Sequence, residues 1–254
     1  MVQRIAAAVY GIICYIVFFA TFLYAIAFVG NIRVPRSVDV GPNASTMEAF
    51  VIDALLLSLF AVQHSVMARQ WFKRAWTRIV PQVIERSTYV LFASAALILL
   101  YWQWRPMTVT IWSVESSVLA TLLWAAFAVG WGMVLVSTFL ISHFDLFGLK
   151  QVYAYYAGKS YPPPKFTTPL FYKMVRHPIY FGFTVAFWAT PHMTAGHLFF
   201  AFMCTAYMVV AIQFEERDLI RAHGARYETY RKSVSMLIPV PMRTAGPKTN
   251  ATGG

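Results

Sequence analysis

The sequence predicts an all-α, polytopic membrane protein with five to six transmembrane helices, including a C-terminal helical hairpin. Hydrophobic residues make up 59% of the 254 positions and charged residues only 12%, whereas a soluble domain carries roughly 25% charged residues. The apolar residues form runs long enough to cross a bilayer, and basic residues lie between alternate runs. This composition excludes disordered, collagen-like and disulfide-rich proteins. It also argues against a nucleic-acid partner, although the net charge is +11.

Four continuous runs satisfy the length of a spanning helix, which is about 20 mostly apolar residues. They lie at residues 5–29, 49–67, 87–104 and 117–142. The first run is too long for a secretory signal and has no small-residue cleavage site, so we expect it to stay in the protein as a span.

A fifth apolar region, residues 178–214, is interrupted by Pro191, His192 and Gly196. It therefore predicts a helical hairpin with arms at 178–190 and 197–214. At 1.5 Å per residue the first arm is only about 20 Å long, short of the roughly 30 Å hydrocarbon core. We expect this arm to be short, tilted or only partly inserted, which leaves five or six spans.

The basic residues predict the orientation in the cell membrane. All but three of the 21 Lys and Arg residues fall on the side that carries both termini; the exceptions are Arg33, Arg36 and Arg105. Because cytoplasmic loops carry the excess of Lys and Arg, both termini are expected in the cytoplasm. We divide the chain into N-terminal transmembrane helices (1–141), a cytoplasmic loop plus hairpin forming the cofactor-binding core (142–240), and a flexible tail (241–254).

Three short blocks around the hairpin contain the chemically informative residues. They are Arg176-His177-Pro178-x-Tyr180-x-Gly182, Glu215-Glu216, and Gly224-x-x-Tyr227-x-x-Tyr230. An antiparallel hairpin returns to the face it left, so the blocks are expected to meet at the cytoplasmic interface, with Gly182 letting the second arm approach closely. Basic and aromatic residues at helix ends also serve as ordinary membrane anchors. Together, however, cationic, acidic and aromatic groups suit a zwitterionic ligand with an aromatic ring.

These blocks resemble the C-terminal signature of integral membrane methyltransferases related to isoprenylcysteine carboxyl methyltransferase. The segment at 142–152, with the chain length and span pattern, is most similar to the bacterial methanethiol S-methyltransferases, which make dimethyl sulfide with S-adenosylmethionine. The resemblance implies S-adenosylmethionine as methyl donor, a small thiol as the other substrate, and a donor site enclosed by His177, Tyr180, Glu215 and Glu216. No Gly-x-Gly-x-x-Gly motif occurs, so a soluble Rossmann-type cofactor site is unsupported.

Physical reasoning suggests individual roles in such a site. Arg176 or His177 would pair with the donor carboxylate. Glu215 or Glu216 would accept hydrogen bonds from the ribose hydroxyls or the ammonium. An aromatic side chain would stack on adenine or lie near the sulfonium; the candidates are Tyr153, Tyr156 and Phe166. Gln151 and Tyr227 complete the set of donor-binding candidates.

Methyl transfer to a thiol requires thiolate, because a thiol with a pKa of about 8.5 or higher is mostly protonated at neutral pH. His143 and Asp145 follow the fourth run at the cytoplasmic side and are the candidate catalytic pair, since a carboxylate beside an imidazole raises its basicity. The alternative is that both only cap and anchor the helix end. Gln63, His64 and Arg69 are further candidates for the substrate pocket.

Other activities remain open at the level of the sequence. They are methylation of an isoprenylcysteine carboxylate or a lipid amine, and reduction by a membrane NADPH-dependent reductase of similar fold. The adjacent Glu215 and Glu216 favour the methyltransferase. The spacing of His, Cys and acidic residues predicts no metal site, and the expected partners are the thiol and the lipid bilayer, with a homo-oligomer also allowed.

Overall fold

The computed structural model describes residues 1–162 and 166–240. The flexible tail predicted at 241–254 lies outside these described residues. Five helices are long and apolar enough to cross a membrane: α1 (Val2–Val29), α2 (Thr46–Ala68), α4 (Gln82–Gln103), α5 (Ser117–Ile141) and α9 (Ala195–His223). The four continuous runs and the second arm of the hairpin therefore form spans, as predicted. The first arm is α8 (Pro178–Trp188), which has only 11 residues, so the prediction of a short arm is also confirmed.

Local sequence signals set the beginnings of these helices. The Ser45, Ser116 and Thr194 side chains accept hydrogen bonds from backbone N–H groups in the first turns of α2, α5 and α9, respectively. Such caps satisfy donors that have no partner within the helix. Pro178 occupies the first turn of α8, where its missing N–H is tolerated.

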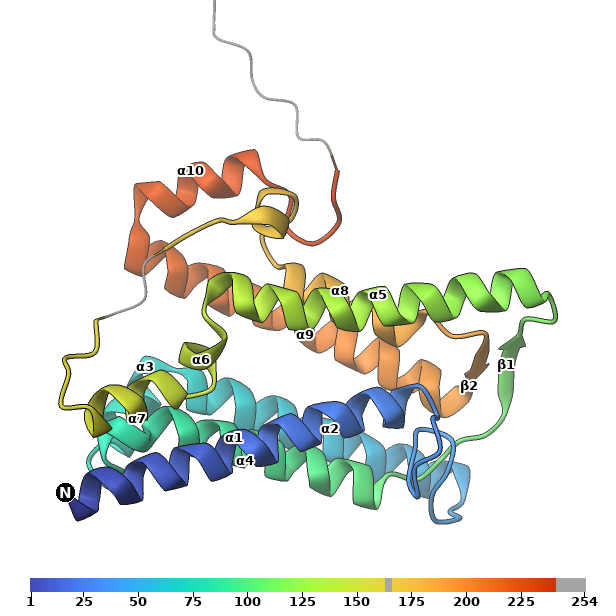
Figure 1. The fold of residues 1–254 in the computed structure, drawn as a ribbon. Helices are drawn as coiled ribbons and strands as arrows, with labels where there is room; N and C mark the ends of the chain where they lie inside the picture. The colour runs from blue at the N-terminus through green and yellow to red at the C-terminus, as the bar shows by residue number, and fades with distance from the viewer. Residues whose placement is uncertain (163–165, 241–254) are drawn as a thin grey trace, which may run out of the picture.

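The spans form two layers (Figure 1). Helices α1, α2 and α4 pack together in one layer, and α5, α8 and α9 lie in the other. Large buried aromatic side chains fill the space between the layers near one end: Phe28, Tyr101, Trp104, Trp131 and Phe200. The ring of Phe28 contacts those of Tyr101, Trp104 and Phe200 at centroid distances of 4.9–6.0 Å, so this cluster joins α1 and α4 to α9.

The short arm α8 packs mainly along α5, its most extensive helix contact. A Cβ added at Gly182 would lie 2.7 Å from the carbonyl oxygen of Gly130 in α5. The expectation that Gly182 lets the second arm of the hairpin approach is therefore wrong. Gly182 and Gly130 are paired small residues that let the backbones of α5 and α8 approach each other.

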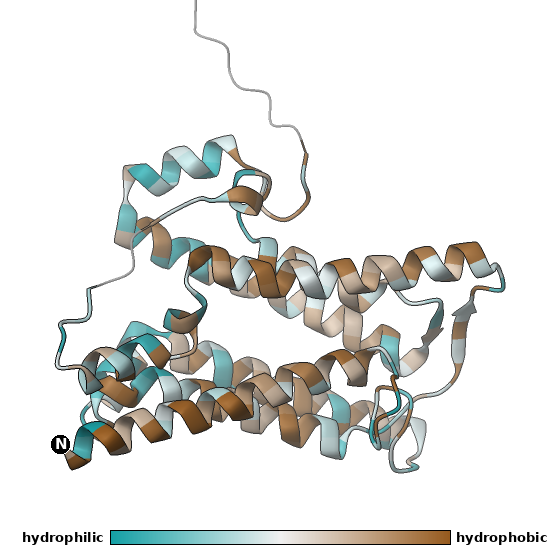
Figure 2. Ribbon diagram, in the orientation of Figure 1, coloured by the Kyte–Doolittle hydropathy of each residue, from teal (hydrophilic) through white to brown (hydrophobic). Residues whose placement is uncertain are grey.

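The two ends of the bundle differ. One end holds a two-stranded antiparallel sheet of β1 (Thr110–Ser113) and β2 (His192–Thr194) that the sequence did not predict. The other end holds α3 (Gln70–Trp76), α6 (His143–Leu146), α7 (Leu149–Tyr156), the 3₁₀ helix η1 (Leu170–Lys173) and α10 (Ala225–Ser233). Figure 2 shows hydrophilic residues gathered at this second end, which also holds the N-terminus.

Helix α9 is longer than expected. The hydropathy pattern placed its end at residue 214, but the helix continues to His223. Glu215 and Glu216 therefore lie inside a helix rather than at its end. Hydropathy falls where the helix leaves the apolar layer, whereas the backbone hydrogen bonds continue until Gly224, whose positive φ of 54° begins the turn into α10.

Candidate active site

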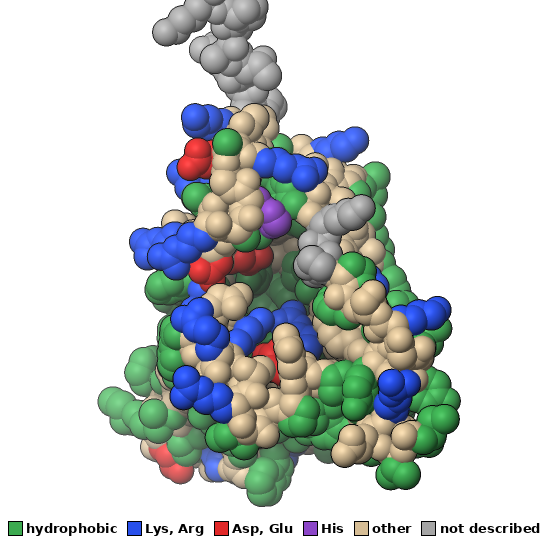
Figure 3. Space-filling view, turned by 90° about the vertical axis from the view of Figure 1, so that its left-hand side faces the viewer, with side chains coloured by type: hydrophobic (Ala, Val, Ile, Leu, Met, Phe, Trp, Pro, Cys, Tyr) green, Lys and Arg blue, Asp and Glu red, His purple; other side chains and the backbone are tan. Residues whose placement is uncertain are grey.

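A cavity of about 1350 Å³ opens at the polar end, between the two layers of helices. It is larger than the roughly 300–1,000 Å³ of a typical small-molecule site, so it has room for two substrates. Its deep part is lined by apolar and aromatic side chains, including Phe22, Trp131 and Phe200, and its mouth by charged ones. Figure 3 views this end of the molecule and shows Lys and Arg side chains around a hollow that holds acidic groups.

Most of the predicted site residues line this cavity. These are His143, Asp145, Gln151, Arg176, His177, Tyr180, Glu215 and Tyr227. Phe166, Arg69 and His64 also line it. Tyr153 is exposed and does not line it, nor do Tyr156, Gln63 and the buried Glu216. Spacing along the chain could not show that Tyr153 points out of α7 while Gln151 points in.

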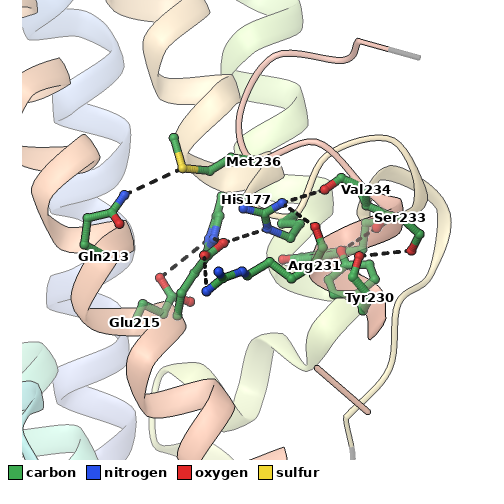
Figure 4. A network of polar contacts seen from close by, with 11 residues as sticks. His177, Gln213, Glu215, Tyr230, Arg231, Ser233, Val234 and Met236 are labelled. Atoms are coloured by element: carbon green, nitrogen blue, oxygen red, sulfur yellow. Dashed lines mark hydrogen bonds and ion pairs between the residues drawn. The ribbon is translucent and has the colours of Figure 1, made fainter. Parts of the chain in front are cut away.

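A network of polar contacts joins α9 to the residues around His177 and to the end of α10 (Figure 4), and the buried Glu216 is its main acceptor. Its Oε1 accepts hydrogen bonds from Arg176 Nε at 2.6 Å and from His177 Nε2 at 3.2 Å. Arg176 Nη1 also donates to the backbone oxygens of Arg231 (3.0 Å) and Val234 (2.6 Å). The side chains of Arg176 and Glu216 are only 9% and 8% exposed. This ion pair therefore ties α9 to the start of α8 and to the end of α10.

Glu215 has a different environment from its neighbour. Its Oε2 accepts a hydrogen bond from the Tyr180 hydroxyl at 3.0 Å and lies 3.8 Å from His177 Nδ1. The Glu215 side chain is 43% exposed and lines the cavity. Of the two adjacent glutamates, Glu216 is thus engaged within the protein, while Glu215 presents its carboxylate to the cavity.

Asp145 lies in the opposite wall and is held by three donors. It accepts hydrogen bonds from Ser142 Oγ (2.7 Å), Lys150 Nζ (2.9 Å) and the Tyr161 hydroxyl (2.6 Å). Burial raises the pKa of Asp145, but these three donors outweigh it, so the pKa lies below its usual range. Gln151 Nε2 supports the group by donating to the Asp145 carbonyl and to the Tyr161 hydroxyl, both at 3.2 Å.

Tyr161 is a residue of this wall that the sequence reasoning missed. Burial, together with the hydrogen bond to Asp145, raises its pKa, so the hydroxyl stays protonated and continues to donate. The aromatic content of the segment between α5 and α8 was a signal for it. That content alone does not select one tyrosine among several.

His143 does not contact Asp145 in the way the sequence suggested. Thr138 Oγ1 donates to the Leu135 carbonyl, so it accepts from His143 Nδ1 at 2.8 Å. His143 Nε2 then accepts from the Tyr15 hydroxyl at 2.9 Å. Both ring nitrogens are engaged, and burial lowers the pKa of His143, which favours the neutral imidazole. The two side chains separate because residues i and i+2 of a helical turn do not face each other.

Helices α3 and α4 form the remaining wall of the mouth. The sequence analysis named no site residue on these helices; it named only Arg69, which directly precedes α3. Arg69 Nη1 pairs with Asp218 Oδ2 at 2.8 Å, which joins the end of α2 to α9. Lys73 and Arg86 line the cavity beside it. In the sequence these cations belong to the basic clusters expected on the cytoplasmic side. The rule that cytoplasmic loops are rich in Lys and Arg already explains such clusters, so they did not indicate a site.

Comparison with known proteins identifies the family. No family model matches the sequence, and no solved structure is significantly similar. A methanethiol S-methyltransferase of Mycobacterium tuberculosis is 57% identical over 241 residues, which cover 95% of this chain and 99% of the relative. One from Crocosphaera subtropica is 53% identical over 93% of each chain. Methanethiol S-methyltransferase 1 of Bradyrhizobium diazoefficiens is 58% identical over 93% of this chain and 83% of the relative. A chain with this signature, this cavity and relatives of this identity over nearly its whole length belongs to the methanethiol S-methyltransferase family.

Proposed function

We propose that this membrane protein transfers the methyl group of S-adenosylmethionine to the sulfur of methanethiol, yielding dimethyl sulfide and S-adenosylhomocysteine. The observation that carries the proposal is the identity to methanethiol S-methyltransferases over more than nine-tenths of the chain. A cavity with a charged mouth and an apolar interior supports it, because a charged donor and a small apolar acceptor require these two environments.

The mouth of the cavity offers groups that fit S-adenosylmethionine, which supplies an electrophilic methyl group when bound. Glu215 accepts hydrogen bonds from the ribose hydroxyls or from the ammonium. Tyr227 and Phe166, whose ring centroids are 5.8 Å apart, provide an aromatic surface for adenine. Asp145 is ionised and favours a nearby sulfonium.

The apolar interior suits the acceptor. A direct displacement needs the attacking sulfur in line with the methyl group, so the protein contributes mainly proximity and orientation. Trp131, Phe187 and Phe200 line the deep part and leave little there for a charged acceptor to bind. This arrangement favours a small thiol over an acceptor with a carboxylate.

We assign Asp145 and His143 different roles. With its pKa below the usual range, Asp145 is a weak proton acceptor for a thiol. It acts instead through its negative charge and by accepting the hydrogen bond that orients Tyr161. His143 acts as a positioning residue that links Tyr15 of α1 to Thr138 of α5 at the edge of the cavity.

The cavity mouth faces the cytoplasm in this proposal, with both termini on the same side. The support is the excess of Lys and Arg on the polar end of the bundle. Homo-oligomer formation, which the sequence allows, stays a prediction that light scattering on the purified protein would test.

The function is tested with purified protein in detergent and S-adenosylmethionine labelled in its methyl group. We expect labelled dimethyl sulfide when methanethiol is added, and thermal stabilisation by S-adenosylhomocysteine but not by NADPH. Labelled product only with a prenylated cysteine or a lipid amine would overturn the acceptor and keep the reaction class. Stabilisation by NADPH alone would overturn the class.

A further inference from the structure

Two cations stand together on the wall of the cavity mouth, one on each of two neighbouring helices. Lys73 on α3 and Arg86 on α4 both line the cavity and are half-buried. Neither forms a salt bridge with any of the described residues. They differ in this from Arg69 and Arg176, whose charges are paired with Asp218 and Glu216.

The pair is electrostatically unfavourable by itself. Burial lowers the pKa of Lys73, and the charge of Arg86 lowers it further, while Glu85 and Asp218 offset only part of the effect. Like charges that share a partly buried site destabilise each other unless an anion binds between them. Such groups in a cleft mark a candidate ligand site.

Arg86 is held in a fixed position. Its Nε donates to the Leu146 carbonyl at 2.7 Å, and its guanidinium lies 5.0 Å from the centre of the Tyr89 ring. The bond at Nε leaves the terminal nitrogens to serve a ligand. Within residues 1–162 and 166–240, no group accepts a hydrogen bond from these terminal nitrogens. A guanidinium in this state, with an ammonium beside it, matches a carboxylate.

The anion site faces the acidic side of the mouth. Arg69 occupies the N-cap position of α3, one turn before Lys73. It pairs with Asp218, which lies one turn after Glu215 on α9. This chain of contacts places the cationic pair and Glu215 on facing walls of one opening. An amino-acid group, which has a carboxylate and an ammonium on one carbon, fits such an arrangement.

We propose that Lys73 and Arg86 bind the carboxylate of the methyl donor at the cavity mouth. This inference rests on the proposed function. It assigns the carboxylate to α3 and α4 rather than to Arg176, whose Nε and Nη1 are already engaged with Glu216 and the end of α10.

The test is the affinity of Lys73→Met for two ligands, measured by calorimetry on the full chain in detergent. We expect the Kd for S-adenosylhomocysteine to rise about tenfold or more, as for loss of a hydrogen bond to a charged group. The Kd for decarboxylated S-adenosylmethionine should equal that of the unchanged protein. Lys73→Arg should restore most of the affinity. Arg74→Met is the matched control, because Arg74 is the exposed neighbour on α3 and does not line the cavity.

Several outcomes would overturn the inference. If the unchanged protein binds S-adenosylhomocysteine and Lys73→Met binds it equally well, this inference fails and the proposed function stands. An equal loss for the decarboxylated ligand would mean that Lys73 does not recognise the carboxylate. If phosphatidylglycerol added to the micelles displaces the ligand from the unchanged protein but not from Lys73→Met, the site holds a lipid phosphate instead. If the unchanged protein binds neither ligand, the proposed function fails as well.

Discussion

Neighbouring residues of the same type have different tasks in this protein. Glu216 points into the protein, where it pairs with Arg176 and accepts a hydrogen bond from His177, whereas Glu215 lies at the surface of the cavity. Adjacent positions on a helix point in directions about 100° apart, so one carboxylate is buried and the other is available. The sequence indicated that both glutamates matter but could not divide these roles between them.

The role of Arg176 predicts a specific loss of stability. Arg176→Ala leaves the Glu216 carboxylate buried without its main partner, which should lower the free energy of unfolding by about 3–5 kcal/mol. Thermal unfolding in detergent without any ligand measures this. Arg221→Ala is the control, because Arg221 is exposed and pairs with Asp218 only at 3.7 Å, so its loss should have no measurable effect. An unchanged melting temperature for Arg176→Ala, with weaker S-adenosylhomocysteine binding, would instead make Arg176 a ligand of the donor.

At the scale of the elements, the close contact of α5 and α8 positions the signature residues. Helix α8 is too short to span the layer by itself, and it begins at Pro178, directly after Arg176 and His177. Its packing on α5 through Gly130 and Gly182 therefore decides where these two side chains lie in the mouth. Small residues allow this contact because backbones can approach only where no side chain intervenes.

A pair of glycines on α5 tests this contact. A Cβ at Gly130 would lie 2.7 Å from backbone atoms of both Gly182 and Ala186. Gly130→Ala should therefore separate the helices and lower the free energy of unfolding by about 1–3 kcal/mol. A Cβ added at Gly132, on the same helix, would meet no neighbouring atom within 4 Å, so Gly132→Ala should be neutral or stabilising through its better helix propensity. Equal melting temperatures for the two variants would argue against the close contact.

At the scale of the whole molecule, two layers of helices enclose one amphipathic cavity. The charged mouth lies at the end with α3, α7 and α10, and the small β1–β2 sheet closes the opposite end. Both the N-terminal helices and the hairpin contribute to the walls. The site is therefore a property of the assembled bundle and not of the C-terminal signature alone.

The proposed orientation predicts which end reacts with a reagent that cannot cross the membrane. In a variant without Cys14 and Cys204, Arg74→Cys at the polar end should be labelled by a membrane-impermeant maleimide only in inside-out vesicles. Glu115→Cys, at the end with the β1–β2 sheet, should be labelled only in right-side-out vesicles. Both positions are exposed, so each serves as the control for the other. The reverse pattern would contradict the orientation.

The sequence by itself determined the membrane class, the family, and the bounds of the spans to within a few residues, except for the end of α9. These follow from local properties: an apolar run must satisfy its backbone hydrogen bonds as a helix wherever it lies in the bilayer. The three-block signature also pointed to residues that line the cavity, namely Arg176, His177, Tyr180, Glu215 and Tyr227.

Only the tertiary structure decided how those residues are used. The separation of His143 from Asp145, the engagement of Arg176 by Glu216 and the contact of Tyr161 with Asp145 depend on the directions of side chains on helices that meet in space. For the same reason, the sequence did not indicate that Lys73 and Arg86 form a cationic pair. In the sequence both residues belong to a basic cluster that the orientation rule fully explains, and only the packing of α3 and α4 shows that these two charges face the cavity.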